Sequence, residues 1–449
     1  METLIQKYNV SGPRYTSYPT VPFWKNNDLN QQVWINSIHA NFKFFNSNEI
    51  SLYIHLPYCE SLCTFCGCHK RITKNHAVET PYIDAVIQEW KTYTSLLNFK
   101  PIIRELHLGG GTPTFFQPNE LKRLLEEIFS MATIHPTDYE FSFEAHPNNT
   151  TEAHLQTLFD LGFRRLSLGI QDYSPIVQKA IHRIQSFEQV EKVNRKAKEI
   201  GYTSISHDLV FGLPKQVVSD IQNTISKTLE LMPDRISLYS YAHVPWVKGV
   251  GQRGFDENDL PKNEEKRELY ESAKLHLESA GYLEVGMDHF ALAHDSLAIA
   301  LRNKKLHRNF MGYTTQNTSL MIGLGMSSIS DSWFGFAQNE KKVETYIERV
   351  QKGELPVFRG HLLSEEDLII RRHILNLMCH FETVVTEEWL LKDVRLRLAE
   401  MIKDGLVVSE NNTIKITDAG IPFIRNACMA FDLDLIGTEQ RERLFSKTV

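Results

Sequence analysis

The feature that most limits the possible folds is an alternation of short β-rich runs with longer amphipathic segments, which extends over about residues 50 to 290. The β-rich runs occupy residues 51–57, 104–111, 140–147, 164–172, 204–214 and 235–245. Strands that alternate with helices are typical of βαβ units and of a parallel sheet. An α/β fold is therefore predicted, and a further extended run at 282–290 is expected to enlarge its sheet.

The segments between these runs carry helix signals. After Pro81, one apolar stripe typical of an amphipathic helix is formed by Ile83, Val86, Ile87, Trp90 and Leu97. Three other helical patterns stop at a glycine that leads into the next run, at Gly162, Gly201 and Gly281. Six such units predict a six-stranded, partly open parallel (β/α) barrel over residues 48–290, rather than a closed eight-stranded one.

Further segments flank this core. Residues 1–47 form an irregular, aromatic N-terminal arm, and residues 291–360 are expected to extend the barrel and connect it to the rest. Residues 361–449 resemble a winged-helix module, because helices precede a predicted hairpin at 404–420 with Asn411-Asn412 at its turn. No basic recognition helix accompanies the hairpin, so this C-terminal domain is expected to act as a lid or shield rather than to read DNA.

The composition excludes several classes of protein. The 449 residues correspond to two or three domains, or to one barrel with appendages, and 42% hydrophobic residues suffice for a large core. A net charge of −6 argues against a nucleic-acid partner. No apolar run approaches the roughly 18 residues that span a bilayer, and the first residues do not resemble a signal peptide. A cytoplasmic protein with no membrane partner is therefore expected.

Four of the six cysteines lie close together, in the arrangement Cys59-x3-Cys63-x2-Cys66-x-Cys68. In a long chain without a secretion signal, such a cluster is typical of metal or redox chemistry rather than of disulfides. Thiolates bind zinc or iron–sulfur clusters, and a structural zinc site usually draws on two separated pairs of ligands. One compact loop therefore favours an iron–sulfur cluster, with a zinc knuckle or free reduced thiols as the alternatives.

Unusual residues also gather where the predicted strands end, which is where parallel sheets bind their ligands. These ends carry the cysteines, the triple glycine at 109–111, Glu144, Gln171, Asp208 and Ala242-His243. Glycines let the backbone approach a ligand closely, and Asp208 is suited to hydrogen bonding with ribose hydroxyls because its unpaired burial would be costly. Taken singly, these residues also fit a tight turn and exposed edge carboxylates, and Arg183 fits a surface ion pair.

The motif CxxxCxxC after the predicted strand Tyr53-Ile54-His55 resembles the signature of the radical S-adenosylmethionine (SAM) superfamily. Along nearly the whole chain, further motifs resemble one family within it, the oxygen-independent coproporphyrinogen III oxidases, or coproporphyrinogen dehydrogenases. These motifs include SGPRYTSYPT (11–20), CTFCGCHK, HLGGGTPT, HDLVFGLPKQ (207–216), GMDHFA (286–291) and LHRNFMGYTTQ (306–316). Met311 departs from the family pattern, in which a glutamine is expected, so no polar role is expected there.

The resemblance implies a [4Fe–4S] cluster whose iron ligands are Cys59, Cys63 and Cys66, with the fourth iron open to SAM. It also implies two SAM molecules in one site. The first would contact Tyr53, Gly110, Glu144 and Ile329. The second would contact Phe65, Gly111, Thr112, Gln171, Arg183, Asp208 and Ala242. Cys68 resembles the extra, catalytic cysteine of the family, which is not a cluster ligand; a small buried thiol is the alternative.

The implied reaction is the anaerobic oxidative decarboxylation of two propionates of coproporphyrinogen III to the vinyl groups of protoporphyrinogen IX, a step of haem biosynthesis. A 5′-deoxyadenosyl radical from SAM would abstract hydrogen from the propionate. An electron donor for the cluster and a terminal electron acceptor are also implied, and the chain is expected to be a monomer. The alternatives are a haem-trafficking relative, which the fourth cysteine and the PRYTSYP motif disfavour, and a structural zinc protein with a DNA-binding end.

The N-terminal arm contains Arg14, Tyr15 and Tyr18. Because arginine matches carboxylate geometry, the arm is expected to fold over the open barrel mouth and to hold a propionate. Packing against the barrel alone is the alternative. On the first interpretation, deletion of residues 1–20 leaves the fold intact and stops substrate conversion.

Overall fold

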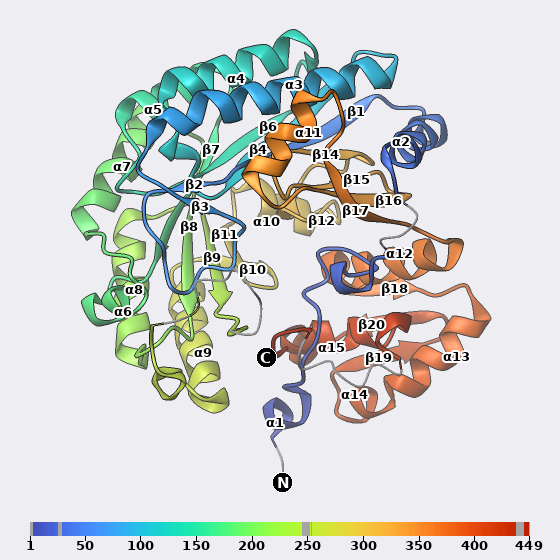
Figure 1. Cartoon of the computed structure of the whole chain (residues 1–449). Helices are drawn as coiled ribbons and strands as arrows, with labels where there is room; N and C mark the ends of the chain where they lie inside the picture. Colours follow the sequence, from blue (N-terminus) through green and yellow to red (C-terminus); the bar gives the residue numbers. More distant parts are fainter. Residues whose placement is uncertain (1–2, 26–28, 245–251, 253, 437–443, 449) are drawn as a thin grey trace.

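The computed structural model describes residues 3–25, 29–244, 252, 254–436 and 444–448. Among these residues, thirteen strands form one large sheet at the centre of the molecule (Figure 1). In spatial order they are β10 (Tyr282–Gly286), β11 (His289–Leu292), β9 (Arg235–Ser240), β8 (Ser204–Phe211), β7 (Arg165–Gln171), β6 (Glu140–Ala145), β4 (Ile102–Gly110), β1 (Glu49–Leu56), β14 (Met321–Leu324), β15 (Ile329–Asp331), β16 (Gly335–Asn339) and β17 (Val357–Leu362), while β5 (Thr133–Ile134) pairs with β4.

The six runs predicted from the sequence are β1, β4, β6, β7, β8 and β9. They are neighbours in the sheet, and every pairing between two of them is parallel. The sheet is larger than the six-stranded unit expected, because β14 adds a further parallel strand beside β1, and antiparallel strands extend both edges. The run at 282–290 does enlarge the sheet, as β10 and β11. The sheet is open, with β10 and β17 at its two edges in the described part of the chain.

Helices cover the outer face of the parallel strands (Figure 1). Successive helices contact one another in the order α3 (Glu79–Leu97), α4 (Pro118–Ser130), α5 (Glu152–Asp160), α7 (Phe187–Ile200), α8 (Val218–Leu231) and α9 (Asn263–Ser279). The predicted apolar stripe after Pro81 is buried on α3. Gly162, Gly201 and Gly281 follow their helices with positive φ, which explains why glycine ends each one. Three shorter helices are α6 (Pro175–Ala180), α10 (Ser296–Arg302) and α11 (Val343–Gln351).

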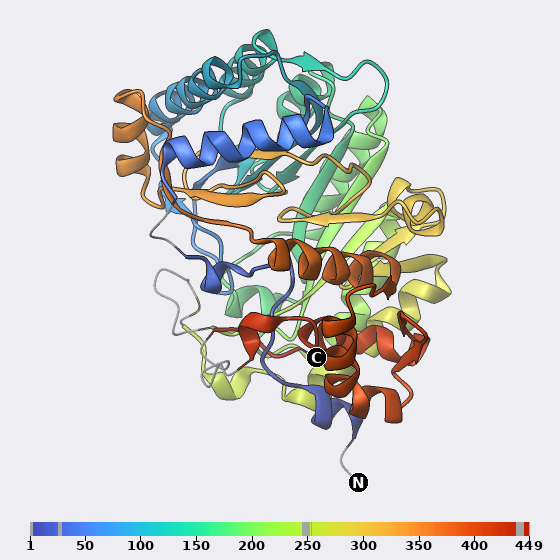
Figure 2. The same cartoon turned by 90° about the vertical axis from the view of Figure 1, so that its right-hand side faces the viewer.

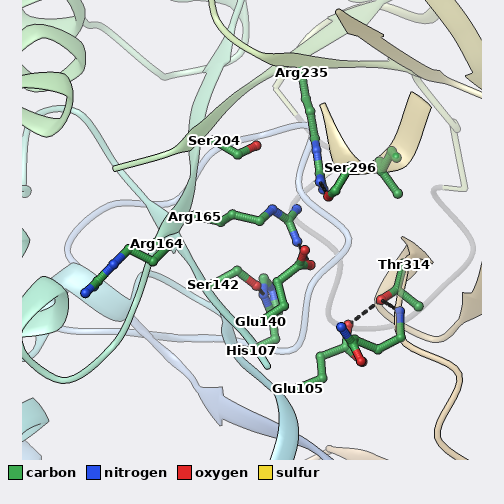
Figure 3. A network of polar contacts seen from close by, with 12 residues as sticks. Glu105, His107, Glu140, Ser142, Arg164, Arg165, Ser204, Arg235, Ser296 and Thr314 are labelled. Carbon is green, nitrogen blue, oxygen red and sulfur yellow. Dashed lines mark hydrogen bonds and ion pairs between the residues drawn. The ribbon is translucent and has the colours of Figure 1, made fainter. Parts of the chain in front are cut away.

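The two faces of the parallel strands differ in polarity. Alternate residues of a strand point to opposite faces, and in β1 the outward residues Leu52, Ile54 and Leu56 belong to the main hydrophobic core. The inward residues of neighbouring strands are polar. Figure 3 shows part of this inner network, where Arg165 pairs with Glu140, His107 contacts Ser142, and Thr314 donates to Glu105 at 2.6 Å. Glu140 and Arg165 are the first residues of their strands, so this network fills the interior at the amino ends of the strands.

The N-terminal arm and the C-terminal residues form a second unit. The arm contains α1 (Leu4–Tyr8) and α2 (Gln31–Phe45), and in both views it runs alongside the C-terminal helices before it reaches α2 (Figures 1 and 2). Tyr8, Tyr15 and Tyr18 are buried in a second hydrophobic cluster with residues of α12 (Glu365–His380) and α15 (Ile424–Met429). The arm is therefore part of a second core, and it does not only cover the barrel.

The predicted C-terminal hairpin is present. Strand β19 (Val407–Glu410) pairs with β20 (Thr413–Ile416) across Asn411-Asn412, and β18 (Glu382–Val384) joins the other edge of β20. Helices α13 (Glu388–Arg397) and α14 (Ala399–Lys403) precede the hairpin. Two further strand pairs lie outside the main sheet, namely β2 (Tyr58–Cys59) with β3 (Arg71–Ile72), and β12 (His307–Asn309) with β13 (Gly312–Thr314). In the described residues, no helix combines the length and the apolarity that crossing a bilayer requires.

Candidate active site

A cavity of about 170 Å³ lies at the carboxyl ends of five parallel strands, namely β1, β4, β6, β7 and β8. Its lining comes from chain segments that are far apart in sequence. The predicted site residues that it brings together are Cys59, Cys63, Phe65, Cys66, Cys68, Gly110, Gly111, Thr112, Glu144, Gln171, Arg183 and Asp208. The parallel order of the strands explains this convergence, because it places all of their carboxyl ends at one edge of the sheet.

The cysteine loop follows β1 and is held by hydrogen bonds at its middle and at its C-terminal end. Thr64 donates from its backbone N–H to the Ile181 carbonyl and from its hydroxyl to the Ala180 carbonyl, both at 3.0 Å. The Lys70 ammonium group donates to the carbonyls of Cys66 and Cys68 at 3.2 and 3.3 Å. All four thiols of the loop are free of disulfides. The loop is therefore held against the rest of the site before any metal binds.

The thiols of this loop differ in acidity. Burial raises the pKa of the Cys59 thiol to about 11, although Thr112 donates a hydrogen bond to its sulfur at 3.3 Å. The pKa of the Cys66 thiol is lowered to about 6, chiefly because Cys68 donates a hydrogen bond to it. Metal ligands must be thiolates, so Cys59 is expected to release a proton when a metal binds.

The arrangement of the thiols also bears on the kind of metal site. Among the described residues, no three His, Cys, Asp or Glu side chains converge closely enough to hold a single metal ion. A cluster does not need such convergence, because each thiolate binds a different iron. Three soft thiolate ligands on one cavity wall therefore fit an iron–sulfur cluster.

The triple glycine closes the cavity floor beside β1. Gly110 has a φ of +111°, and a Cβ there would lie 2.7 Å from the His55 ring. A Cβ on Gly111 would lie 2.5 Å from the Pro57 carbonyl oxygen. The Gly110 N–H donates to Glu144 at 3.2 Å, and the Gly111 N–H donates to the Leu56 carbonyl at 2.8 Å. Only glycine fits these positions, because strand β4 ends in close contact with the start of the cysteine loop.

Two charged side chains lie across the cavity from the glycines. The Asp208 carboxylate accepts a hydrogen bond from the Ser167 hydroxyl at 2.7 Å, and burial raises its pKa to about 6. Arg183 donates to the Gly169 carbonyl and contacts the Cys63 sulfur at 3.7 Å, while its buried Nε has no partner among the described residues. The cavity thus offers an acceptor and a cation to a zwitterionic ligand.

A second cavity of about 410 Å³ adjoins the first and shares Cys68, Gly110 and Glu144 with it. The predicted residues Tyr53 and Ile329 line this second cavity. Its other lining residues are Val21, His55, His69, His107, Phe310, Met311, Met321, Ser327, Ser328, Gln338 and Arg359.

Ala242 is the predicted residue that lies apart from both cavities. It lines a third cavity beyond the end of β9, together with Tyr241 and His243. The Gln252 amide nevertheless connects it to the cysteine loop, because it donates to the carbonyls of Ala242 and Phe65 at 2.8 and 3.2 Å.

Known proteins match this chain over nearly its whole length. A sequence model of the radical SAM superfamily matches residues 53–228. The oxygen-independent coproporphyrinogen III oxidase of Escherichia coli (strain K12) is 38% identical over 459 residues, and that of Helicobacter pylori (strain J99) is 37% identical over 452 residues. Each alignment covers 99% of this chain and 98% of the relative. This chain belongs to the oxygen-independent coproporphyrinogen III oxidase family.

The fold agrees with this family. The solved structure of coproporphyrinogen III oxidase from Escherichia coli, described as a radical SAM enzyme, superimposes with a TM-score of 0.89 at 35% sequence identity. The match covers 94% of this chain and 98% of that structure. The radical SAM assignment made from the cysteine motif is therefore confirmed.

Sequence reasoning missed several residues that line the site of this family member. His107 and Ser167 lie on inward positions of β4 and β7, and Lys70 lines the first cavity. The alternation of inward and outward residues along β4 and β7 could have identified His107 and Ser167. Arg359 lies far along the chain on β17, and no sequence motif indicated that it would line the second cavity.

Arg14 does not have the position that the sequence suggested. It lines a separate small cavity, where it pairs with Asp288 at 2.7 Å and donates to the Ser240 carbonyl at 3.2 Å. Tyr15 is buried and donates to Asp432 at 2.9 Å. These partners already use the polar groups that were expected to hold a propionate. The arm does reach the second cavity, but it does so through Val21.

Substitution of Asp208 by asparagine is expected to stabilise the ligand-free protein at pH 8 and to weaken SAM binding. The folded pKa of about 6 lies above the ordinary value of 3.8, so ionisation costs folding free energy, at most about 3 kcal/mol. Well below pH 4 the carboxyl is protonated in both folded and unfolded states, and the two proteins should be equally stable. The difference in the free energy of unfolding between the two proteins grows between about pH 4 and 6 and stays constant at higher pH. Urea unfolding at pH 4.5 and 8 measures it.

The matched control for this experiment is Asp393→Asn, which removes an exposed carboxylate of a surface ion pair. It should change the free energy of unfolding by less than about 0.5 kcal/mol at either pH. An Asp208→Asn protein that is less stable than the wild type at pH 8, or that binds SAM equally well, would contradict the assignment of Asp208 as a buried, ligand-directed carboxylate.

Proposed function

We propose that this protein oxidatively decarboxylates two propionate side chains of coproporphyrinogen III to vinyl groups, giving protoporphyrinogen IX in anaerobic haem biosynthesis. The observation that carries the proposal is the near-complete match to relatives named for this reaction. The adjoining pair of cavities at the strand ends supports it, because one carries the thiols and the other offers room for part of a large substrate. Neither alternative drawn from the sequence has a comparable observation in its favour.

Cys59, Cys63 and Cys66 would hold the [4Fe–4S] cluster of this radical SAM protein. They fit it, since they are free thiols on one cavity wall, and the loop that carries them is anchored at Thr64. When bound, the cluster and SAM supply the one-electron chemistry that removes a hydrogen atom from the substrate. Cys68 borders both cavities, which supports a catalytic role for it rather than a ligand role.

Two SAM molecules per chain are part of the proposal. Tyr53, Gly110, Glu144 and Ile329 would contact the first, and they lie along the boundary between the two cavities or in the second. The second would be held by Phe65, Gly111, Thr112, Gln171, Arg183, Asp208 and Ala242. All of these except Ala242 line the first cavity. The Asp208 carboxylate and Arg183 then orient the charged ends of SAM, and the glycines let the ligand approach the backbone closely.

The protein's own contribution is to position the propionate and to exclude water from the radical. Each vinyl group forms when the β-carbon loses a hydrogen atom and the carboxylate leaves as CO2, with one electron passing to an acceptor. A terminal electron acceptor and an electron donor for the cluster are therefore required partners. We further propose a cytoplasmic monomer with no nucleic-acid partner.

We also propose the division into an arm (1–47), a barrel (48–290), an extension (291–360) and a winged-helix-like lid (361–449). The buried apolar residues of the C-terminal helices lie in a cluster separate from the main core, which supports a division between barrel and C-terminal unit. This second cluster also includes Val285 and residues of the extension such as Leu297 and Tyr313. The order of helices and strands around the hairpin supports the winged-helix comparison. Because the arm tyrosines belong to the second cluster, the arm and the C-terminal unit pack together.

An anaerobic assay of the reconstituted protein with coproporphyrinogen III, SAM and a reductant tests the function. The expected result is conversion to protoporphyrinogen IX through a monovinyl intermediate, with two CO2 released per substrate. Omission of SAM is the control, and it should stop the reaction. A protein that carries the cluster and cleaves SAM but leaves the substrate unchanged would contradict the proposal.

A further inference from the structure

The second cavity is lined by one arginine, Arg359, whose positive charge has no carboxylate partner among the described residues. Arg359 is the single Lys or Arg among the described residues that line it. Burial lowers the pKa of the nearby His55 and His69 side chains, the latter to about 4, so both are neutral at pH 7. Arg359 is therefore the permanently charged cation that this cavity offers to an anionic ligand.

Two contacts hold the Arg359 guanidinium in place, one with Gln338 and one with Trp24. Arg359 on β17 lies opposite Gln338 on β16, and its Nε donates to the Gln338 amide oxygen at 2.7 Å. The guanidinium lies over the ring of Trp24, 5.6 Å from the ring centre, and that ring in turn stacks on Phe336. These contacts fix the orientation of the guanidinium plane and leave its two terminal NH2 groups unused.

No protein group in the described residues neutralises this charge. No carboxylate of these residues lies within ion-pair distance of Arg359, and no hydrogen bond is made by its terminal nitrogen atoms. Arg371, in contrast, pairs with Asp331. A half-buried, unpaired arginine is costly, and its free NH2 pair has the geometry that binds a carboxylate through two parallel hydrogen bonds. The arrangement fits a ligand that brings its own carboxylate.

We infer that Arg359 is a substrate-positioning residue that binds the carboxylate of one propionate of the tetrapyrrole. The inference rests on the proposed function, which supplies a substrate with four propionates. The apolar lining of the same cavity, from Val21, Phe310, Met311 and Met321, suits the pyrrole ring that carries this propionate.

The bound propionate is one that keeps its carboxylate during that turnover. Arg359 lines the second cavity, whereas the proposed cluster ligands Cys59, Cys63 and Cys66 line the first, so Arg359 lies away from the proposed cluster. A reacting carboxylate leaves as neutral CO2, and a cation bound to it would stabilise the starting state more than the transition state. Arg359 therefore contributes equally to binding the substrate and the transition state, and its loss should raise KM rather than lower kcat.

Replacement of Arg359 by alanine or by glutamine tests the inference. In the anaerobic assay of reconstituted protein, KM for coproporphyrinogen III should rise about ten- to a hundredfold, because a charge-assisted hydrogen-bond pair is lost. The value of kcat should change less than about threefold. Arg359→Lys keeps the charge without the paired donors and should recover part of the affinity. The matched control is Lys341→Ala, which removes a nearby positive charge that does not line the cavity.

Direct binding gives a second readout that does not depend on turnover. Coproporphyrin III, the air-stable oxidised form of the substrate, and its tetramethyl ester are titrated into the reconstituted protein, and porphyrin fluorescence is followed. Wild-type protein should prefer the acid, and Arg359→Gln should lose that preference while binding the ester as before. A variant that weakens the acid and the ester equally, or that leaves KM unchanged in an active enzyme, overturns the inference while the proposed function stands. Wild-type protein that makes no product overturns both.

Discussion

Replacement of Cys59, Cys63 or Cys66 by alanine is expected to eliminate the iron–sulfur cluster and, with it, all turnover. Each of these thiols would be the single protein ligand of one iron, and the described cavity wall offers no other thiol besides Cys68 as a substitute. Anaerobic reconstitution followed by iron and sulfide analysis should give metal contents close to those of a blank, and conversion of coproporphyrinogen III should fall to background. Cluster absorbance in the visible range reports the same loss.

Two controls separate ligand loss from general damage. Cys68→Ala should keep the cluster but lose conversion, because Cys68 borders the second cavity and is not proposed as a ligand. Cys379→Ala removes a thiol buried in the second hydrophobic cluster, and it should keep both cluster and activity. A Cys68→Ala protein without cluster, together with a Cys63→Ala protein that retains it, would reverse the ligand assignment.

Deletion of residues 1–20 is expected to unfold the C-terminal unit, contrary to the expectation drawn from the sequence alone. The deletion removes Tyr8, Tyr15 and Tyr18, which are 8%, 2% and 3% exposed. Loss of a large buried aromatic side chain costs about 3–5 kcal/mol, so the three together rival the whole stability of a typical domain. The backbone carbonyls of Gly12 and Pro13, which accept hydrogen bonds from the buried Arg425, are lost as well.

Hydrogen exchange resolved by peptide measures this effect. Peptides from α12 and α15 should lose protection in the truncated protein, while those from α3 and β4 should keep it. Tyr15→Phe is the matched point variant, since it removes the hydrogen bond to Asp432 and keeps the ring. It should cost about 1–2 kcal/mol and leave the fold intact. Wild-type protection of α12 in the truncated protein would contradict the structural role assigned to the arm.

The barrel was predictable because its signals are local. The strands of the core are short runs rich in apolar residues, and three of the helices end at a glycine such as Gly201, so the pattern can be read without knowing the tertiary contacts. The location of the site followed as well, since polar residues at the ends of parallel strands such as Asp208 must meet at one edge. The antiparallel extension was harder to recognise, because β15 has three residues and β16 is buried along its whole length, so that β16 shows no alternation of buried and exposed residues.

The residues whose positions the sequence did not predict have partners that are distant in the chain. Arg14 was expected at the substrate, yet its carboxylate partner is Asp288, 274 residues away. The charge that does face the second cavity is Arg359, whose environment is set by Trp24 and Gln338 from two other segments. Sequence spacing carries no information about such pairings. Residue type could be predicted from the chemistry of the substrate, but the particular arginine could not.

The sharing of one hydrophobic cluster by the arm and the C-terminal helices has a consequence for synthesis on the ribosome. Tyr8, Tyr15 and Tyr18 leave the exit tunnel long before their partners on α12 and α15 have been made. The strands from β1 to β9 instead pair with neighbours that are close in the chain, so the barrel can form while translation continues. During that interval the three tyrosines remain exposed and depend on the nascent barrel or a chaperone for cover. The segment translated first is thus the last to reach its native contacts.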